Sequence, residues 1–430
     1  MTQSNAFLTA NPGNGNRLAS LALQGGGSHG AFTWGVLDAL LEDGRIDIEG
    51  VSGTSAGAMN AVVLAHGMAQ SEGQSRASRN DAARQGLSRF WTGIVNLGAW
   101  SSSASSSLSQ WQRAPFNILL GHLGGGIWSS ASWTDEITRY WSGTLSPYQS
   151  NPFDINPLKD FLKSQVDFER LAAAAHPATP KVFVVATRVS TGKAEVFSGK
   201  RLTADAVMAS ACLPTVFRAV EIEGDHFWDG GYTGNPALHP LIYQCRSRDI
   251  ILVQINPIQR DKLPTQPGEI ADRVNEITFN AALVAEMRAI DFVKRLLAEG
   301  KLDPAQYKDV LMHRIDGGEA LEKFSASTKA STDSNLIYAL RDLGRLCARQ
   351  WLIKRYKSLG SESSVNIARL PRRSAAAGGK IAKRCGEAPW SVALSDARFG
   401  AGPLAPCLWP LGLAAKRRKQ NHVPDAGAVG

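Results

Sequence analysis

The sequence predicts an α/β fold in which a mainly parallel central sheet lies between two layers of helices. Short apolar runs typical of strands alternate with stretches of helical periodicity, which favours a parallel sheet covered on both faces. Glycine-rich loops stand at two strand-to-helix junctions, at residues 25–30 and 53–57. Because sites in such sheets lie at the C-terminal ends of the strands, we expect both loops to border one functional site.

The chain of 430 residues divides into four parts by composition and pattern. We expect a flexible leader at 1–17, a main domain at 18–245, a last core strand with a helical extension at 246–360, and a basic, disordered tail at 361–430. The hydrophobic content of 43% is that of a soluble globular protein. No run of about 18 apolar residues is present, and the polar N-terminus lacks the apolar core of a secretory signal.

The net charge of +9 is concentrated in the tail. Residues 361–430 hold 11 Lys or Arg against 4 Asp or Glu, so +7 of the charge lies there and the first 360 residues are nearly neutral. A nucleic-acid partner is therefore not expected. The odd number of scattered cysteines indicates a reducing, cytoplasmic location without a disulfide framework or a metal site. They are Cys212, Cys245, Cys347, Cys385 and Cys407.

The first predicted strand, Leu18 to Leu23, leads through a glycine loop into a helix at Ala31 to Leu41. Such loops expose N–H groups that can bind an anion. One use is a dinucleotide phosphate, because the loop formally fits the Rossmann fingerprint and Glu49 stands near the expected acidic position. A second use is an oxyanion hole for an ester-cleaving serine, and a third is a tight turn only. We favour the oxyanion hole, because it uses both glycine loops at once.

The second glycine loop carries a serine. A short strand at Ile46 to Val51 precedes Gly53-Thr54-Ser55-Ala56-Gly57, and a buried helix follows from Ala56 to His66, closed by Gly67. A serine between strand and helix, with glycine two residues to either side, has the layout of a nucleophile elbow. The start of the helix directs N–H groups and the positive end of its dipole at the serine, which favours negative charge there. A turn without chemistry is the alternative.

A serine nucleophile needs a base, and Asp229-Gly230-Gly231 supplies a candidate. The motif follows a predicted strand at Ile222 to Trp228, which Glu223-Gly224-Asp225 interrupts. Its glycines allow the backbone to bring the carboxylate close to another segment. A surface turn is the alternative for this motif. His226 and His239 are alternative bases, which would belong to a Ser–His–Asp triad.

Together these motifs resemble those of the patatin-like phospholipase family. The order of the glycine loop, the elbow and the Asp-Gly-Gly motif is similar, and the segment from Ala209 to Phe217 resembles the Ala-Ser-x-Ala-x-Pro-x-x-Phe segment of bacterial members. This resemblance covers about Leu18 to Pro240. The segment from about Asp249 to Arg355 resembles the helical extension of one bacterial subgroup.

The resemblance implies a three-layer patatin-like fold and a serine acyl hydrolase that acts on phospholipids or related lipids. It implies a Ser–Asp dyad, an acyl-enzyme intermediate, and no catalytic histidine, metal or cofactor. Carried over by position, Ser55 is the nucleophile and Asp229 the proton acceptor. Gly25, Gly26 and Gly27 form the oxyanion hole, and Gly30, Gly53, Gly57, Gly230 and Gly231 complete the motifs.

Two positions depart from the family pattern. Gln24 stands where the family often has Asp, and it is not expected to impair catalysis because the oxyanion donors are backbone N–H groups. His29 stands where the family often has Arg or Lys, which leaves open whether a local positive charge assists.

A Trp-rich insertion is expected at about 91–145, and residues 98–133 within it are rich in Ser and Gly. Because tryptophan suits bilayer interfaces, we interpret this insertion as a lid that meets lipid, with packing beneath a surface insertion as the alternative. Its tryptophans are Trp91, Trp100, Trp111, Trp128, Trp133 and Trp141.

The remaining elements follow from periodicity and breaker residues. A polar helix is expected within 70–90, and an extended connector from Ser146 to Leu158. Helices are predicted at Phe161 to Ala175, Ala204 to Ala211, Glu269 to Gly300 and Leu336 to Lys357, and strands at Lys181 to Thr187, Ala194 to Ser198 and Asp249 to Asn256, the last being the final core strand.

Two function classes remain. The favoured one is a lipid acyl hydrolase with peripheral contact to an anionic membrane, which Lys416-Arg417-Arg418-Lys419 of the tail would strengthen. A solvated tail without a role is the alternative for that segment. The second class is a nucleotide-binding protein that uses the glycine loop, for which Ser55 and Asp229 are incidental.

Overall fold

The computed structural model of the chain describes residues 7, 15–104, 146–150, 156–173, 179–324, 328–329 and 331–365. Eight strands are assigned in these residues: β1 (Arg17–Leu23), β2 (Ile46–Gly53), β3 (Lys181–Arg188), β4 (Lys193–Phe197), β5 (Val220–Ile222), β6 (Asp225–Asp229), β7 (Asp249–Gln254) and β8 (Leu311–Asp316). The longer helices are α1 (Gly30–Asp43), α2 (Ala56–Gln70), α3 (Arg76–Ala104), α7 (Pro157–Gln165), α11 (Pro267–Ala298) and α13 (Ser334–Arg355). Shorter helices are α6 (Pro147–Ser150), α8 (Phe168–Ala173), α9 (Ala204–Ser210), α10 (His239–Gln244) and α12 (Gly318–Glu322).

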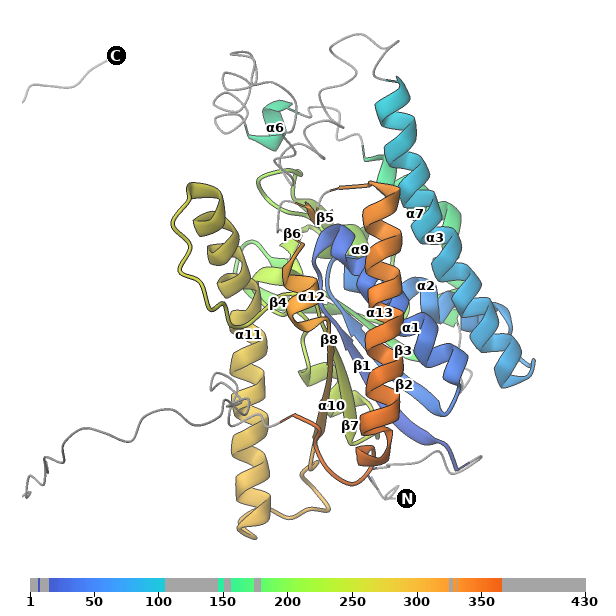
Figure 1. Ribbon diagram of the computed structural model, residues 1–430, viewed down its shortest axis with the longest axis vertical. Helices are drawn as coiled ribbons and strands as arrows, with labels where there is room; N and C mark the ends of the chain where they lie inside the picture. The colour runs from blue at the N-terminus through green and yellow to red at the C-terminus, as the bar shows by residue number, and fades with distance from the viewer. Residues whose placement is uncertain are drawn as a thin grey trace, which may run out of the picture. The chain divides into compact units, whose positions relative to one another are not determined.

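All of these strands form one mixed, mostly parallel sheet in the order β5-β6-β3-β2-β1-β7-β8, with β4 paired to β3 (Figure 1). Five neighbouring strands of this sheet, β3, β2, β1, β7 and β8, run parallel to one another. Strands β4 and β6 are antiparallel to β3. The predicted α/β class with a mainly parallel sheet between helices is therefore confirmed. The carboxyl ends of β1 and β2 lie side by side, and each continues into one of the two glycine loops.

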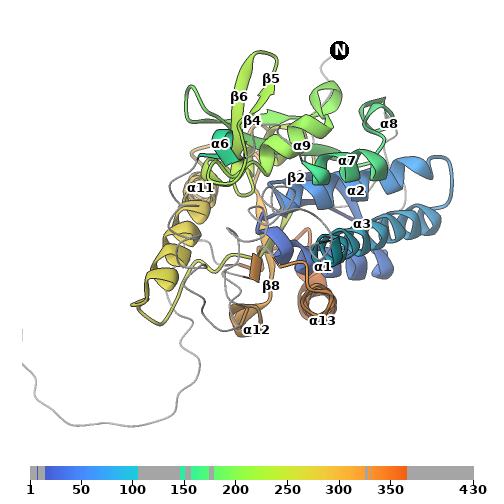
Figure 2. The ribbon, with the colours of Figure 1, turned by 90° about the horizontal axis from the view of Figure 1, so that it is seen from above.

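Helices cover both faces of the sheet, as Figures 1 and 2 show. Alternate side chains of one strand enter different cores, because successive residues of a strand point to opposite faces. Leu21 and Leu23 of β1 pack in the core beneath α1, α2, α3 and α13. Ala22 packs with Leu283 and Met287 in the core beneath α10 and α11. Burial of each large apolar side chain stabilises the fold by about 1.5–3 kcal/mol.

Helices α1 and α13 are in backbone contact at two glycines. A Cβ at Gly35 would lie 1.9 Å from the carbonyl oxygen of Arg341, and one at Gly344 would lie 2.1 Å from that of Phe32. The two helices run parallel, because Trp34 near the start of α1 contacts Tyr338 near the start of α13, whereas Glu42 near the end of α1 pairs with Arg349 farther along α13. The segment that precedes α13 is therefore brought to the glycine loop that precedes α1.

Several predicted boundaries are wrong, each for a local reason. Asp249–Gln254 is not the last core strand, because β8 continues the sheet beyond it. Gly67 does not end α2; it lies inside the helix, where a Cβ would be 2.5 Å from the Cα of Ala83 on α3. The polar helix expected within 70–90 continues to Ala104.

Other predicted elements are divided differently. The helix expected at 161–175 is two helices, since α7 ends at Gln165 and α8 begins at Phe168. The interrupted strand at 222–228 is a hairpin, in which Glu223 and Gly224 have positive φ values of 55° and 82° and connect β5 to β6. The connector expected to be extended from 146 contains the short helix α6.

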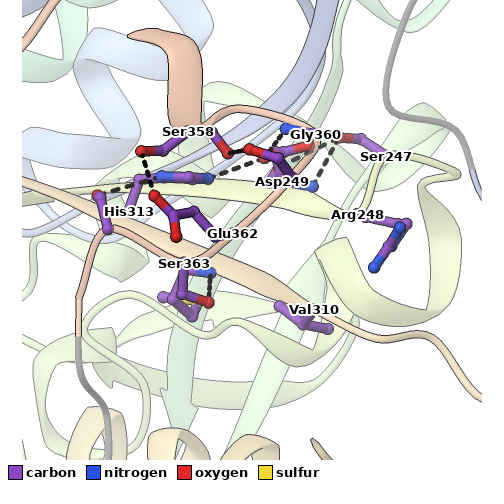
Figure 3. A network of polar contacts seen from close by, with 12 residues as sticks. Ser247, Arg248, Asp249, Val310, His313, Ser358, Gly360, Glu362 and Ser363 are labelled. Atoms are coloured by element: carbon purple, nitrogen blue, oxygen red, sulfur yellow. Dashed lines mark hydrogen bonds and ion pairs between the residues drawn. The ribbon is translucent and has the colours of Figure 1, made fainter. Parts of the chain in front are cut away.

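A buried polar network lies at the amino ends of β7 and β8 (Figure 3). His313 and Asp249 are both fully buried, and His313 Nε2 lies 2.8 Å from Asp249 Oδ1. His313 Nδ1 lies 3.1 Å from the Ser364 hydroxyl, and the Gly360 N–H donates to Asp249 Oδ1 at 2.9 Å. We call these four residues the His313 network. Through Gly360 and Ser364, these hydrogen bonds hold the segment that follows α13 against strands β7 and β8.

No helix among the described residues combines the length and the apolar character that a membrane span requires. The leader up to residue 14, apart from Phe7, lies outside those residues, and so does the tail from 366 onward. The predictions for these segments, including the basic run at Lys416, are untested.

Candidate active site

Ser55 lies at the turn between β2 and α2, as the elbow pattern predicts. Its backbone has a φ of 54° and a ψ of −122°, which is strained for a residue with a side chain. The flanking glycines are required by close backbone approaches. A Cβ at Gly53 would lie 2.5 Å from the carbonyl oxygen of Gly57, and one at Gly57 would lie 2.2 Å from that of Leu23. Small residues therefore permit the sharp turn that presents the serine.

Asp229 ends β6, and its carboxylate lies near the Ser55 hydroxyl, which lowers the pKa of that carboxylate. The side chain is only 3% exposed. The Gly231 N–H donates to Asp229 Oδ1 at 2.6 Å, and a Cβ at Gly230 would lie 2.1 Å from the carbonyl oxygen of Val185. The Asp-Gly-Gly motif is thus a tight, buried turn, not the surface turn that was its alternative.

Burial raises the pKa of Asp229 to about 7, although hydrogen bonds from the Gly231 N–H and the Ser55 hydroxyl lower it. The physical cause is desolvation, because a charged carboxylate is disfavoured away from water. A carboxyl group with this pKa can accept a proton and release it again near neutral pH.

The segment from 209 to 217 joins the two sides of the site. The Ser55 N–H donates to the Ser210 hydroxyl at 2.9 Å, and the Asp229 N–H donates to the Cys212 carbonyl at 2.7 Å. One short stretch at the end of α9 therefore fixes the backbone of both candidate catalytic residues. The sequence shows that this segment resembles one found in bacterial members of the family, but it does not predict these two contacts.

Four buried amide side chains hold the first glycine loop in place. Gln24 Oε1 accepts the N–H groups of Ile255 and Asn256, both at 2.8 Å, and Gln24 Nε2 donates to Asn280 Oδ1 at 3.0 Å. Asn256 Nδ2 donates to the Gly25 carbonyl at 2.8 Å, and Asn235 Oδ1 accepts the Gly25 N–H at 2.6 Å. The frequent Asp of the family is therefore replaced by an amide that clamps the loop to the end of β7.

The three loop glycines are not equivalent. The N–H of Gly25 is already engaged by Asn235, so it is not free to bind an oxyanion. A Cβ at Gly25 would lie 2.8 Å from the Cβ of Ser55, so its absence allows the loop to pack against the elbow. For the N–H groups of Gly26 and Gly27, no hydrogen-bond partner occurs among the described residues. These two remain as candidate donors.

His29 is buried and does not supply a positive charge. Burial, and secondly the charge of Lys329, lowers its pKa to about 3, so the ring is neutral at physiological pH. Its Nε2 lies 2.7 Å from the Thr328 hydroxyl. The sequence left open whether a positive charge at this position assists catalysis, and His29 itself does not provide one.

The two alternative bases lie elsewhere. His226 is exposed on the β5–β6 hairpin, 4.0 Å from the Glu221 carboxylate, and His239 begins α10, 3.4 Å from Glu286. Neither is hydrogen-bonded to Ser55 in the part of the chain that the structure describes. The geometry therefore favours the carboxylate of Asp229 over a histidine.

Trp91 belongs to the core and not to a lid. It lies in α3, is buried, and donates from Nε1 to Asn60 Oδ1 at 3.0 Å while stacking on Trp34. The packing alternative is therefore correct for this residue. The prediction of a lipid-facing lid is untested for the other tryptophans of the expected insertion. The side chain of Trp100 and all residues from 105 to 145 lie outside the residues that the structure describes.

The described residues contain no group of three or more His, Cys, Asp or Glu side chains that could hold a metal ion. The arrangement of Ser55, Asp229 and the loop N–H groups requires no such ion, since a hydroxyl, a base and hydrogen-bond donors suffice for acyl transfer.

The chain is similar to a known protein family and to solved structures. The family described as "Patatin-like phospholipase" matches residues 21–242, a range that includes both glycine loops and the Asp229 motif. VipD from Legionella pneumophila shares 17% identity at a TM-score of 0.36, with 82% of this chain and 72% of that chain covered. The ExoU–SpcU complex from Pseudomonas aeruginosa shares 20% identity at a TM-score of 0.27, with 79% and 60% covered.

No curated protein matches the sequence. The family match spans more than half of the chain and encloses the elbow, the Asp-Gly-Gly motif and the loop that the structure brings together. The chain therefore belongs to the patatin-like phospholipase family of lipid hydrolases.

Proposed function

We propose that this protein is a serine acyl hydrolase that cleaves acyl esters of phospholipids or related lipids, with Ser55 as nucleophile and Asp229 as general base. The observation that carries the proposal is the Ser55 hydroxyl of the elbow beside the buried carboxyl group of Asp229, whose pKa burial raises to about 7. Such a group can take the serine proton and later return it to a leaving alcohol at neutral pH.

The reaction proceeds through a covalent intermediate. Ser55 Oγ attacks the ester carbonyl carbon while its proton passes to Asp229, and the carbonyl oxygen becomes negative. The N–H groups of Gly26 and Gly27, with the positive end of the α2 dipole, stabilise that oxygen. The carbon–oxygen bond to the alcohol then breaks, and the alcohol takes the proton from Asp229. The acyl group remains on Ser55.

Water completes the cycle. It attacks the acyl-Ser55 ester and gives a proton to Asp229, and the same donors again stabilise the negative oxygen. The bond to Ser55 Oγ then breaks, Asp229 returns the proton to this oxygen, and a free fatty acid leaves. Each donor in such a site contributes about 3–4 kcal/mol to the stabilisation of the transition state.

The nucleotide-binding alternative lacks its acidic partner. The Glu49 carboxylate accepts the N–H groups of Arg246 at 2.9 Å and Ser247 at 2.7 Å. Glu49 is the extra residue of a bulge in β2, opposite Ala19 and Ser20 of β1, and it lies several residues before the carboxyl end of that strand. A ribose that reached the loop end of the sheet would not meet this carboxylate.

An apolar face beside the site supports contact with a lipid aggregate. Ile270, Val274 and Ile277 follow one side of α11 and are 46%, 55% and 54% exposed. The same helix borders the Asp229 motif, because the ring of Phe279 meets that of Tyr232 at 5.4 Å. We infer that this α11 face rests on the lipid surface from which the substrate enters.

A panel of lipid esters assayed with wild type and Ser55→Ala tests the proposal. We expect the wild-type protein to release fatty acid from at least one phospholipid or lysophospholipid, and Ser55→Ala to lose this activity by at least about 10³-fold, since the nucleophile is absent. Circular dichroism establishes that the variant is folded. A folded Ser55→Ala protein with wild-type activity would refute the assignment.

A further inference from the structure

Lys329 reaches the glycine loop from outside the region that matches the family. It lies in the segment between α12 and α13, far beyond residue 242. Its carbonyl oxygen is so close to the loop that a Cβ at Gly27 would lie 2.1 Å from it. The neighbouring Thr328 hydroxyl contacts His29 at 2.7 Å. The extension therefore contacts the wall of the candidate active site directly.

The ammonium group of Lys329 begins a series of hydrogen bonds that ends at a candidate oxyanion donor. Lys329 Nζ donates to Asn256 Oδ1 at 2.7 Å, and Asn256 Nδ2 donates to the Gly25 carbonyl at 2.8 Å. The Gly25 carbonyl belongs to the same peptide group as the Gly26 N–H. The cation and this N–H are thus the two ends of one aligned series of amide dipoles.

A cation at one end of such a series strengthens the donor at the other. Hydrogen-bonded amides polarise one another, and bonds that involve an ionised group are stronger than neutral ones. The effect is largest where water is excluded, and Asn256 is fully buried. The Gly26 N–H should therefore bind a negative oxygen more strongly when Lys329 is charged.

Among the described residues, no other cation is bonded to the loop from 24 to 30. His29 is neutral, because burial lowers its pKa to about 3. The charged groups around Lys329 are Glu276 and Asp272, whose charges raise its pKa, and Arg260, which lowers it. Glu276 is itself paired with Arg260 and Arg273. Burial is the largest effect, and it lowers the pKa of Lys329 below its ordinary value.

We propose that Lys329 is a positioning residue of the active site, which acts through Asn256 to strengthen the Gly26 N–H as an oxyanion donor. It supplies from the C-terminal extension the positive charge that relatives often carry within the loop, at the position of His29. This inference rests on the proposed hydrolase function.

Kinetics of Lys329→Met and Lys329→Arg test the proposal with a lipid ester that the wild type cleaves. We expect Lys329→Met to lower kcat by about 10-fold with KM changed less than about twofold, because only transition-state binding is weakened. Lys329→Arg should keep most of the activity. Lys323→Met, at an exposed position on the same segment, is the matched control and should behave as wild type.

The alkaline side of the pH profile separates this role from a structural one. Wild-type kcat should fall when Lys329 loses its proton, at a pH below the ordinary 10.5 of lysine, whereas Lys329→Arg should hold its kcat there because Arg stays charged. This comparison also decides the matter if Lys329→Met does not fold. An equal alkaline loss in both proteins, or wild-type kcat in a folded Lys329→Met, would overturn the inference.

Ser55→Ala separates a failure of the proposed hydrolase function from a failure of the role of Lys329. If it is inactive while Lys329→Met matches wild type, only the role of Lys329 is wrong. If Ser55→Ala retains full activity, the hydrolase assignment and the role of Lys329 are both wrong.

Discussion

Two polar clusters of this molecule have similar ingredients and opposite surroundings. The Ser55–Asp229 pair lies at the carboxyl ends of the parallel strands, whereas the His313 network lies at the amino ends of β7 and β8 (Figure 3). The His313 network has the composition of a catalytic triad, with a serine, a histidine and an aspartate in one series. By composition alone, the His313 network would be a better candidate for a hydrolytic site than the Ser55–Asp229 pair.

The two clusters differ in access and in uncommitted donors. His313 and Asp249 are fully buried, and Asp249 Oδ1 is already bonded to His313 and to the Gly360 backbone. Asp249 Oδ2 has no partner among the described residues, but it is enclosed. Ser55 is only half-buried. The right residue types are therefore not sufficient for a hydrolytic site. The site also requires an accessible nucleophile and backbone N–H groups that are free to bind the oxyanion.

The largest effect should come from the base. Asp229→Ala is expected to lower kcat/KM by about 10³–10⁴-fold, because the serine proton then has no acceptor. His226→Ala and His239→Ala are the controls and should each remain within about twofold of wild type. Esterase assays of the purified proteins check this. Loss of activity in a histidine variant, with Asp229→Ala active, would replace the dyad by a triad.

Replacement in the His313 network should affect stability instead of activity. His313→Ala leaves a buried carboxyl group without its partner, so we expect the free energy of unfolding to fall by about 2–4 kcal/mol. Urea denaturation measures this loss. At a temperature where the variant is folded, kcat/KM should stay within about twofold of wild type. A folded but inactive His313→Ala would mean that the two clusters are not functionally distinct.

The raised pKa of Asp229 gives two pH effects of opposite sign. Activity needs the ionised base, so kcat/KM should rise with pH to a plateau, with a midpoint of about 7. Stability should fall as pH rises from 3.8 to about 7, because the folded-state pKa exceeds the ordinary 3.8 and the folded protein keeps a proton that the unfolded chain loses. The contribution is fully present below pH 3.8 and is lost as pH rises through about 7.

Asp229→Asn isolates the stability effect. It removes the ionisation, so it should be more stable than wild type at pH 8, by on the order of 2–4 kcal/mol, and equal to it near pH 4. Urea denaturation at both pH values checks this. If wild type and Asp229→Asn differ equally at the two pH values, the carboxyl group does not titrate as described.

The smallest effect concerns the α11 face. Ile277→Glu should weaken binding to phospholipid vesicles by several-fold while leaving hydrolysis of a soluble short-chain ester unchanged. Ile353→Glu is the matched control, because Ile353 is 84% exposed and belongs to a different helix, α13. Equal vesicle binding by Ile277→Glu and wild type would exclude this face as the lipid contact.

Local patterns predicted the elbow, the glycine loop and the Asp229 motif, because each depends on residues adjacent in sequence. The contacts that complete the site were not predictable. Asn235, Asn256 and Asn280 stand in unremarkable stretches, and their partners on the loop are more than 200 residues away in the chain. The sequence of three consecutive glycines could not reveal that the N–H of Gly25 donates to Asn235.

Strand β8 was missed for a related reason. Its sequence, Leu311 to Asp316, places a histidine and an arginine among the apolar residues, which breaks the continuous apolar run of a buried parallel strand. The histidine is accommodated only because Asp249 and Ser364 satisfy its ring. Periodicity cannot reveal a polar residue whose partners lie on other elements.

Covalent labelling with an organophosphonate ester tests the central claim most directly. The reagent reacts with a serine only when a neighbouring base activates its hydroxyl, so peptide mass mapping should place the adduct on Ser55 in wild type. Asp229→Asn should label far more slowly. Labelling of another serine instead, such as Ser364, or equal labelling of Ser55 in Asp229→Asn, would contradict the account.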